Sequence, residues 1–199
     1  RRVTLYKGVR EWFARINAYG AARGIRILHY INSSGLKEII EGTEIAHEFR
    51  RIYACSFLYD IDGVAYWPAV AVNYTNKTQF IFKINKGVES VFDSKLVNQY
   101  IEEDKRPVPF RRMIYVGDGT TDIPCMRLVK NSGGHSIAVY NPEIRNARRE
   151  LNGLIRDNRV SHVCPADYSE GSEMDTLVKT IIDKIEADHR LELLETPRT

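Results

Sequence analysis

The residues best suited to chemistry are two aspartates that follow a short apolar run. Residues 113–116 (Met-Ile-Tyr-Val) lead into Gly-Asp-Gly-Thr-Thr-Asp, which places Asp118 and Asp122 directly after that run. In an open α/β sheet, ligands bind at the carboxyl ends of parallel strands, and glycines let the backbone approach a ligand closely. Two carboxylates there suit Mg²⁺. The alternative is a tight turn with Asp118 as a helix cap, but the second aspartate and the preceding strand favour the metal site.

Two other segments carry groups that can bind an anion. Asn-Ser-Ser-Gly at 32–35 follows an apolar run, and hydroxyls and free amides at the start of a helix attract anions. Ser33 and Ser34 are both candidates, and plain helix capping is the alternative. Lys86, in Asn-Lys-Gly at 85–87, offers a point charge for a phosphate. Most lysines are solvated surface residues, so Lys86 supports a site only together with the other motifs.

The elements that must position these residues alternate between helix and strand, as in an α/β layered domain. The pattern predicts helices over 7–22, 36–41, part of 88–101, the segment through Met126, 142–151 and 172–186. It predicts strands over 25–31, 113–116, 136–140 and 160–164, whereas 78–84 fits either type. We therefore expect a mostly parallel sheet with helices on both faces, in a single domain of residues 1–199.

The middle of the chain predicts a β-hairpin, an excursion from that domain over residues 52–76. Apolar runs at 52–59 and 64–72 flank Asp-Ile-Asp-Gly, and Asp-Gly between such runs is a strong hairpin signal. Pro68 places the second strand at an edge or ends it early, because proline cannot donate a ladder hydrogen bond.

The order of the motifs resembles the haloacid dehalogenase (HAD) superfamily of phosphohydrolases, and its phosphoserine-phosphatase-like members most closely. The resemblance rests on a strand followed by Ser, then Lys-Gly, then Gly-Asp-Gly-x-x-Asp, and spans roughly Ile25 to Val139. It implies a Rossmann-like core and a Mg²⁺-dependent phosphatase that hydrolyses a small phosphorylated metabolite through an aspartyl-phosphate.

The resemblance also implies roles for the substrate-binding residues. Ser33 would hold the transferring phosphoryl group, with Ser34 as the alternative. Lys86 would neutralise the phosphoryl charge and steady the nucleophile. Lys77 is the less favoured lysine because no glycine follows it.

The two aspartates take the metal-site roles by the same resemblance. Asp118 would be a Mg²⁺ ligand, and Asp122 would be the second acid, bonded to metal-bound water or to Lys86. Lys86 and Asp122 are therefore the catalytic candidates, and Asp118 and Asp122 the metal-binding candidates. Phosphoryl transfer consists mostly of positioning and charge neutralisation, which a cation and a lysine supply.

The family's nucleophile motif is missing from its expected place. The resemblance implies an Asp-x-Asp upstream of Ser33, whose first aspartate attacks phosphorus and whose second is the general acid and base. Residues 1–24 contain no aspartate. Asp60 and Asp62 form an Asp-x-Asp-Gly after an apolar run, but they follow Ser33 in the chain. A hairpin turn explains them better than a permuted active site.

The chain opens with Arg1 rather than Met, as expected of a piece of a longer protein. We expect the nucleophile strand and a cap to lie upstream, and the missing central strand to leave two unpaired sheet edges. Such a piece alone is predicted to be poorly stable, to self-associate, or to retain the missing segment as a separate fragment. A non-catalytic module that binds phosphate and Mg²⁺ is the alternative to a phosphatase.

Composition excludes several other classes of protein. With 43% hydrophobic and 28% charged residues the chain is not disordered, and no window approaches the ~18 apolar residues of a membrane helix. A net charge of +3, with acids and bases interleaved, is too weak to indicate nucleic acid. Cys55, Cys125 and Cys164 lack disulfide or metal-ligand spacing and favour a reducing cytoplasm. His29 and His135 have no metal-spaced partner, so no zinc site is predicted.

Overall fold

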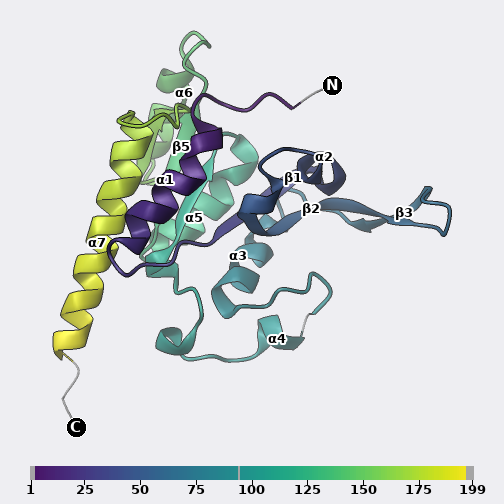
Figure 1. Cartoon of the computed structure of the whole chain (residues 1–199), viewed down its shortest axis with the longest axis horizontal. Helices are drawn as coiled ribbons and strands as arrows, with labels where there is room; N and C mark the ends of the chain where they lie inside the picture. The colour runs from purple at the N-terminus through teal and green to yellow at the C-terminus, as the bar shows by residue number, and fades with distance from the viewer. Residues whose placement is uncertain (1–2, 94, 196–199) are drawn as a thin grey trace.

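The computed structural model describes residues 3–93 and 95–195, and it contains two three-stranded sheets with helices packed against them (Figure 1). The strands are β1 (His29–Leu36), β2 (Phe49–Tyr59), β3 (Ala65–Val70), β4 (Ile114–Gly117), β5 (His135–Tyr140) and β6 (His162–Pro165). The α-helices are α1 (Val9–Ala21), α2 (Lys37–Glu41), α3 (Lys77–Lys86), α4 (Lys95–Asn98), α5 (Ile123–Asn131), α6 (Ala147–Arg156) and α7 (Glu173–Glu195). Short 3₁₀ helices occupy Ala46–Glu48, Glu103–Lys105, Phe110–Arg112 and Thr120–Asp122.

The sheets confirm the predicted α/β class and the predominance of parallel pairing. β4, β5 and β6 form a wholly parallel sheet, and β1 pairs with β2 in parallel. β3 returns antiparallel along β2. Within residues 3–93 and 95–195, no ladder joins β1 to β4, so each of these strands is paired along one edge only. The chain thus has two half-sheets, and β1 and β4 carry the two unpaired edges that were expected from the sequence.

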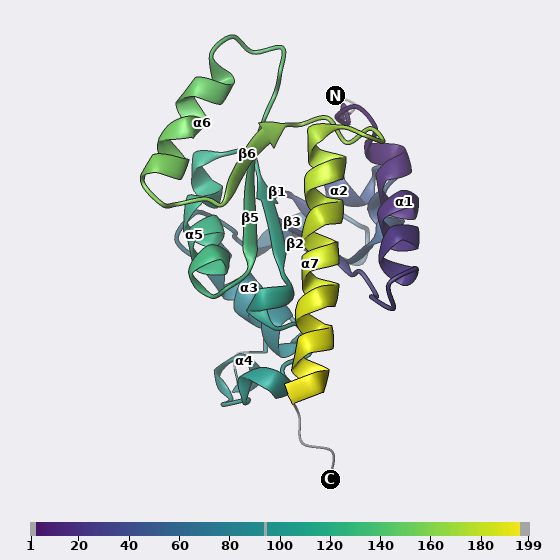
Figure 2. The ribbon, with the colours of Figure 1, turned by 90° about the vertical axis from the view of Figure 1, so that its left-hand side faces the viewer.

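Helices cover both faces of the strands, as predicted. On one face, α1 and α7 enclose a cluster with alternate residues of β5 (Figure 2); its buried members include Trp12, Phe13, Ile16, Ile137, Val139, Met174 and Val178. On the other face, α3 and α5 pack on β2 through Tyr53, Phe80, Ile81, Ile84, Cys125 and Val129. Helix α6 covers that same side of the β4–β6 sheet next to α5, where Leu151 and Leu154 contact the cluster of Met126 and Ala138.

The position of β1 corrects the sequence prediction. The predicted strand 25–31 lies too early, because β1 runs from His29 to Leu36 and includes the segment 32–35 that was predicted as a turn. Its pairing with β2 shows the reason: Asn32 aligns with Tyr53 and Leu36 with Cys55, and an irregularity between them absorbs Ser-Ser-Gly. Ile25 and Ile27 instead pack against the cluster under α1.

Two helices also differ from the prediction. Residues 78–84, which fitted either type, are helical within α3, where Phe80, Ile81 and Ile84 are buried at helical spacing. Helix α7 extends to Glu195, beyond the predicted end at 186. Arg111 and Arg112 bind Glu192 and hold this last part of the helix to the body.

The hairpin prediction is confirmed, with β2 and β3 joined through the turn at 60–63. Asp60 shapes that turn, because its Oδ1 accepts hydrogen bonds from the backbone amides of Asp62 (3.0 Å) and Val64 (2.8 Å). The tip of the hairpin projects away from the β4–β6 sheet, whereas its base lies beside α2, where Glu38 Oε1 accepts a hydrogen bond from the Phe57 amide (Figure 1). No helix in the described part of the chain combines the length and hydropathy needed to cross a membrane.

Candidate functional site

A buried ion pair between Lys77 and Asp122 is the centre of the candidate site. Lys77 Nζ lies 2.6 Å from Asp122 Oδ1, and the Tyr115 hydroxyl donates a second hydrogen bond to the same oxygen at 2.7 Å. The lysine and aspartate side chains are only 5% and 9% exposed. Removing two charges from water is unfavourable unless they pair closely and find further hydrogen bonds. The side chains of Lys77, Tyr115 and Asp122 therefore meet at a single carboxylate oxygen, Asp122 Oδ1.

The turn before α3 fixes the position of Lys77. Asn76 accepts a hydrogen bond from the Asn73 amide and donates one to the Ala71 carbonyl, both at 2.8 Å. This makes Lys77 the first residue of α3. The Asn32 amide donates to the Lys77 carbonyl at 3.1 Å, which ties the end region of β1 to the start of the helix.

Gly117 lets Asp122 lie against the end of β4. A Cβ atom at position 117 would come within 2.6 Å of Asp122 Cβ and 2.7 Å of Met126 Cε. Real Cβ atoms do not approach other atoms so closely, so only glycine fits here. Gly117, the first glycine of the Gly-Asp-Gly motif, is thus required because it leaves room for the side chain of Asp122.

Uncharged polar groups surround the ion pair. Burial raises the pKa of Tyr115, and the nearby Cys125 and Asp122 raise it further. Burial also raises the pKa of the Cys125 thiol, although Tyr115 and Lys77 act in the opposite direction. Asn32 Nδ2 lies 3.9 Å from Cys125 Sγ, and Asn32 Oδ1 is buried without a hydrogen-bond partner among the described residues. Tyr115 and Cys125 therefore stay protonated at neutral pH.

Asp118 lies at the open side of the site, exposed at the end of β4. Its negative charge acts on two tyrosines: burial, chiefly, raises the pKa of Tyr6 and of Tyr168, and Asp118 raises both further. The Tyr168 amide donates to the Lys7 carbonyl at 2.8 Å, so the segment before α1 and the loop after β6 run together here. Asp118 thus lies near enough to Tyr6, before α1, and Tyr168, after β6, for its charge to act on both.

The two serine candidates follow Asn32 directly, which brings them to the same edge. Ser33 is half-buried, and its hydroxyl accepts a hydrogen bond from the Gly35 amide at 3.0 Å. Ser34 is exposed, and its carbonyl faces the Cys55 thiol. Ser33 is therefore the better placed of the two, since it adjoins the residue that contacts Lys77 and Cys125.

The expected contact between Lys86 and Asp122 is absent, and Lys77 makes it instead. Lys86 Nζ donates to the carbonyls of Val97 (2.7 Å) and Gln99 (2.6 Å). The glycine that favoured Lys86 explains the error: Gly87, at φ 68°, ends α3, so Lys86 is the last residue of the helix. At 1.5 Å per residue, the two ends of this helix lie about 13 Å apart.

The residues present do not by themselves make a magnesium site. Both interactions of Asp122 Oδ1 go to Lys77 and Tyr115, which leaves Asp118 as the exposed carboxylate at this edge. Within residues 3–93 and 95–195, no group of three or more His, Cys, Asp and Glu side chains is placed to hold a metal ion. Mg²⁺ keeps several water ligands and is usually held by one or two carboxylates together with substrate phosphates, so Asp118 could supply only one part of such a ligand set.

Three members of the site were not predicted from the sequence: Asn32, Tyr115 and Cys125. Cys125 had a usable signal, because it lies three residues after Asp122 and so on the same side of α5. Lys77 had no such signal, because α3 follows the antiparallel strand β3 and the sequence does not show which end of the helix faces β4. Asn32 had none, since its role depends on the irregular pairing of β1.

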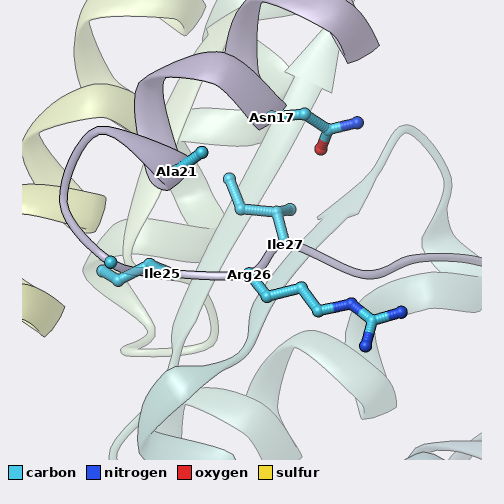
Figure 3. Close-up of a pocket in the computed structure, with 6 residues that line it drawn as sticks. Asn17, Ala21, Ile25, Arg26 and Ile27 are labelled. Carbon is cyan, nitrogen blue, oxygen red and sulfur yellow. The ribbon is translucent and has the colours of Figure 1, made fainter.

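Other features of the chain lie apart from this site. A shallow hollow of about 390 Å³ is lined by Asn17, Ala21, Gly24, Ile25, Arg26 and Ile27, and contains none of the candidate residues (Figure 3). Asp60 and Asp62 lie in the hairpin turn, as the hairpin interpretation required.

Comparison with known proteins extends the view beyond these residues. No protein-family model matches the chain. The chain is similar to an uncharacterized protein of Borreliella burgdorferi, with 29% identity over 177 residues, which cover 78% of this chain and 56% of that protein. The chain thus spans about half the length of the relative it matches.

Proposed function

We propose that this chain is part of a phosphatase that hydrolyses small phosphomonoesters and resembles the HAD superfamily. The observation that carries the proposal is the buried Lys77–Asp122 pair after β4, close in sequence to the exposed Asp118 and linked to β1 through Asn32, the residue before Ser33. An ammonium held in place by a carboxylate suits a transferring phosphoryl group, which needs positioning and charge neutralisation more than covalent chemistry from the protein.

In this proposal, each residue has a defined task. Lys77 neutralises the phosphoryl charge, and Asp122, itself bonded by the Tyr115 hydroxyl, holds the ammonium in place. The Ser33 hydroxyl binds a phosphoryl oxygen, and Asp118 is the carboxylate open to a cation. The nucleophilic carboxylate and the remaining metal ligands come from residues other than these, on a strand between the free edges of β1 and β4. Three free cysteines fit a reducing cytoplasm.

The test is turnover of p-nitrophenyl phosphate by the full-length protein, with MgCl₂ or with EDTA. We expect Lys77→Met and Asp118→Asn each to lower kcat/KM by about 10²-fold or more. Lys86→Met is the matched control and retains activity, because Lys86 binds backbone carbonyls at the other end of α3. Asp118 is exposed, so its variant separates loss of function from loss of fold. Undiminished turnover in Asp118→Asn would exclude the role given to that residue.

A non-catalytic phosphate-binding module is the second candidate. It is favoured by one observation: among the described residues, the only carboxylate in contact with Lys77 is Asp122, which is already paired. A full-length protein that binds inorganic phosphate by calorimetry but turns over no ester, with or without Mg²⁺, would replace the phosphatase by this module.

A further inference from the structure

The tip of the β2–β3 hairpin is an apolar residue between two acids. Ile61 is 100% exposed, and Asp60 and Asp62 flank it. Residues 52–76 contain these two aspartates and no lysine or arginine. An apolar side chain with acids on both sides is complementary to a partner surface that has an apolar floor and basic walls.

The flanks of the hairpin are apolar as well. Exposed side chains line both strands and the turn: Phe57, Leu58, Tyr59, Val64, Tyr66 and Trp67. Together with Ile61 they leave on the order of 800 Å² of apolar surface in water, about what one partner buries in a standard protein interface. Because successive residues of a strand point to opposite faces, these side chains lie on both faces of the hairpin behind its tip. An anionic membrane does not fit, because residues 52–76, which include the tip and its flanks, carry only negative charge.

A surface with the complementary chemistry lies on this same chain, along the outer side of α5. A hollow of about 410 Å³ is lined by Ile123, Pro124, Arg127, Leu128, Asn131 and Arg159. Its floor is apolar and two guanidinium groups line it. Arg127 and Arg159 are exposed, and neither side chain has a hydrogen-bond or ion-pair partner in the described part of the chain.

We propose that this chain binds a second copy of itself, with the hairpin tip of one copy in the α5 hollow of the other. Ile61 covers the apolar floor, and Asp62 pairs with Arg127 or Arg159. Tyr66 and Trp67 cover the surface around the hollow. Complementary charges raise the association rate and fix the register of such a contact. If each copy inserts its tip into the hollow of the other, the two copies form a closed dimer. If each copy instead inserts its tip into the next copy, the contacts extend into a chain of copies.

The experiment is a charge exchange followed by sedimentation of the full-length protein. Asp62 is the residue to reverse, because Asp60 also shapes the turn. We expect the wild type to self-associate, and both Asp62→Arg and the pair Arg127→Glu with Arg159→Glu to sediment as monomers. An equimolar mixture of the two variants restores association, since each tip then meets a hollow of opposite charge. Ile61→Ser weakens association at least tenfold, and so does 1 M NaCl, which screens the ion pairs.

The control is Arg148→Glu, an exposed arginine of α6 outside the hollow, which leaves association unchanged. A wild type that stays monomeric at high concentration would overturn the proposal. So would association that persists in both charge variants, or a mixture that fails to associate. Dissociation by Trp67→Ser without any effect of the charge variants would show a different apolar contact, and would also refute it.

Discussion

Lys77 and Asp122 depend on each other for stability as well as for chemistry. Lys77→Met leaves the Asp122 carboxylate buried beside Tyr115 with no cation, so we expect a loss of about 3–5 kcal/mol in the free energy of unfolding. Urea unfolding measures it. Lys86→Met, at the half-buried other end of α3, should lose distinctly less. Equal losses would show that burial of the lysine stem, rather than the ion pair, dominates.

Substitution by alanine is expected to have opposite effects on stability at Gly117 and at Gly153. Gly117→Ala forces a Cβ atom into Asp122 and Met126, so we expect a destabilisation of about 1–3 kcal/mol. Gly153 lies in α6, where a Cβ atom would meet only Arg156 Nη2 at 3.8 Å, an ordinary contact, and Gly153→Ala should stabilise by about 0.5–1 kcal/mol because alanine favours helix. Thermal unfolding of the two variants compares them. Stabilisation of both would mean that the chain relaxes freely around residue 117.

Helices α1 and α7 are joined through Asp175, which predicts a dependence of stability on pH. Burial opposes ionisation of Asp175, but hydrogen bonds from Lys179, the Gly171 amide and Arg15 outweigh it and hold its pKa below the usual value. A lowered folded-state pKa stabilises the fold above the unfolded pKa of 3.8, and this stabilisation is lost as pH falls below it.

The measurement is the urea midpoint from pH 6 down to pH 2.5. Asp175→Asn should be less stable than the wild type at pH 6, and its midpoint should fall less steeply in acid. Asp188→Asn is the control, because the Asp188–Lys184 ion pair is exposed and such pairs contribute little. An acid slope unaffected by Asp175→Asn would contradict the assignment.

The β2–β3 hairpin depends on Asp60 for its turn. Asp60→Ala removes the acceptor of two backbone amides, so we expect the hairpin to lose about 1 kcal/mol of local stability. Hydrogen exchange of the β3 amides should then speed up several-fold, while β5 amides remain protected. Asp62→Ala, whose side chain makes no such bonds, should leave β3 exchange unchanged.

How far the sequence predicts these elements depends on whether the signal is local. The hairpin, the Gly-Asp-Gly-x-x-Asp edge and the apolar faces of α1, α5 and α7 follow from turn chemistry and periodicity. The boundary of β1 does not, because an irregular ladder with β2 decides where it ends. The choice between Lys77 and Lys86 required knowing which end of α3 faces the ends of the strands. Gly87, which ends α3, had instead indicated a Lys-Gly motif at Lys86.

At the scale of the whole molecule, the free edges of β1 and β4 lead to a prediction about the exchange of their backbone amides. If a further strand pairs with them in the longer protein, their amides will exchange with solvent more slowly there than in the 199-residue chain. Hydrogen exchange on both forms gives the answer, with β5, paired on both sides, as the internal reference. Equal exchange rates at β1 and β4 in both forms would exclude the added strand.

The absence of a ladder between β1 and β4 in the described residues also affects how stiffly the two half-sheets are joined. Backbone ladders resist shear, whereas the two half-sheets are connected here by packed side chains and by the contacts of Asn32, Lys77 and Asp122. The boundary between the two half-sheets, where the candidate residues lie, is therefore expected to be the most easily deformed part of the molecule. A ligand that bridged Ser33, in β1, and Asp118, after β4, would add a further connection between the two half-sheets, and we expect its binding to make the molecule stiffer.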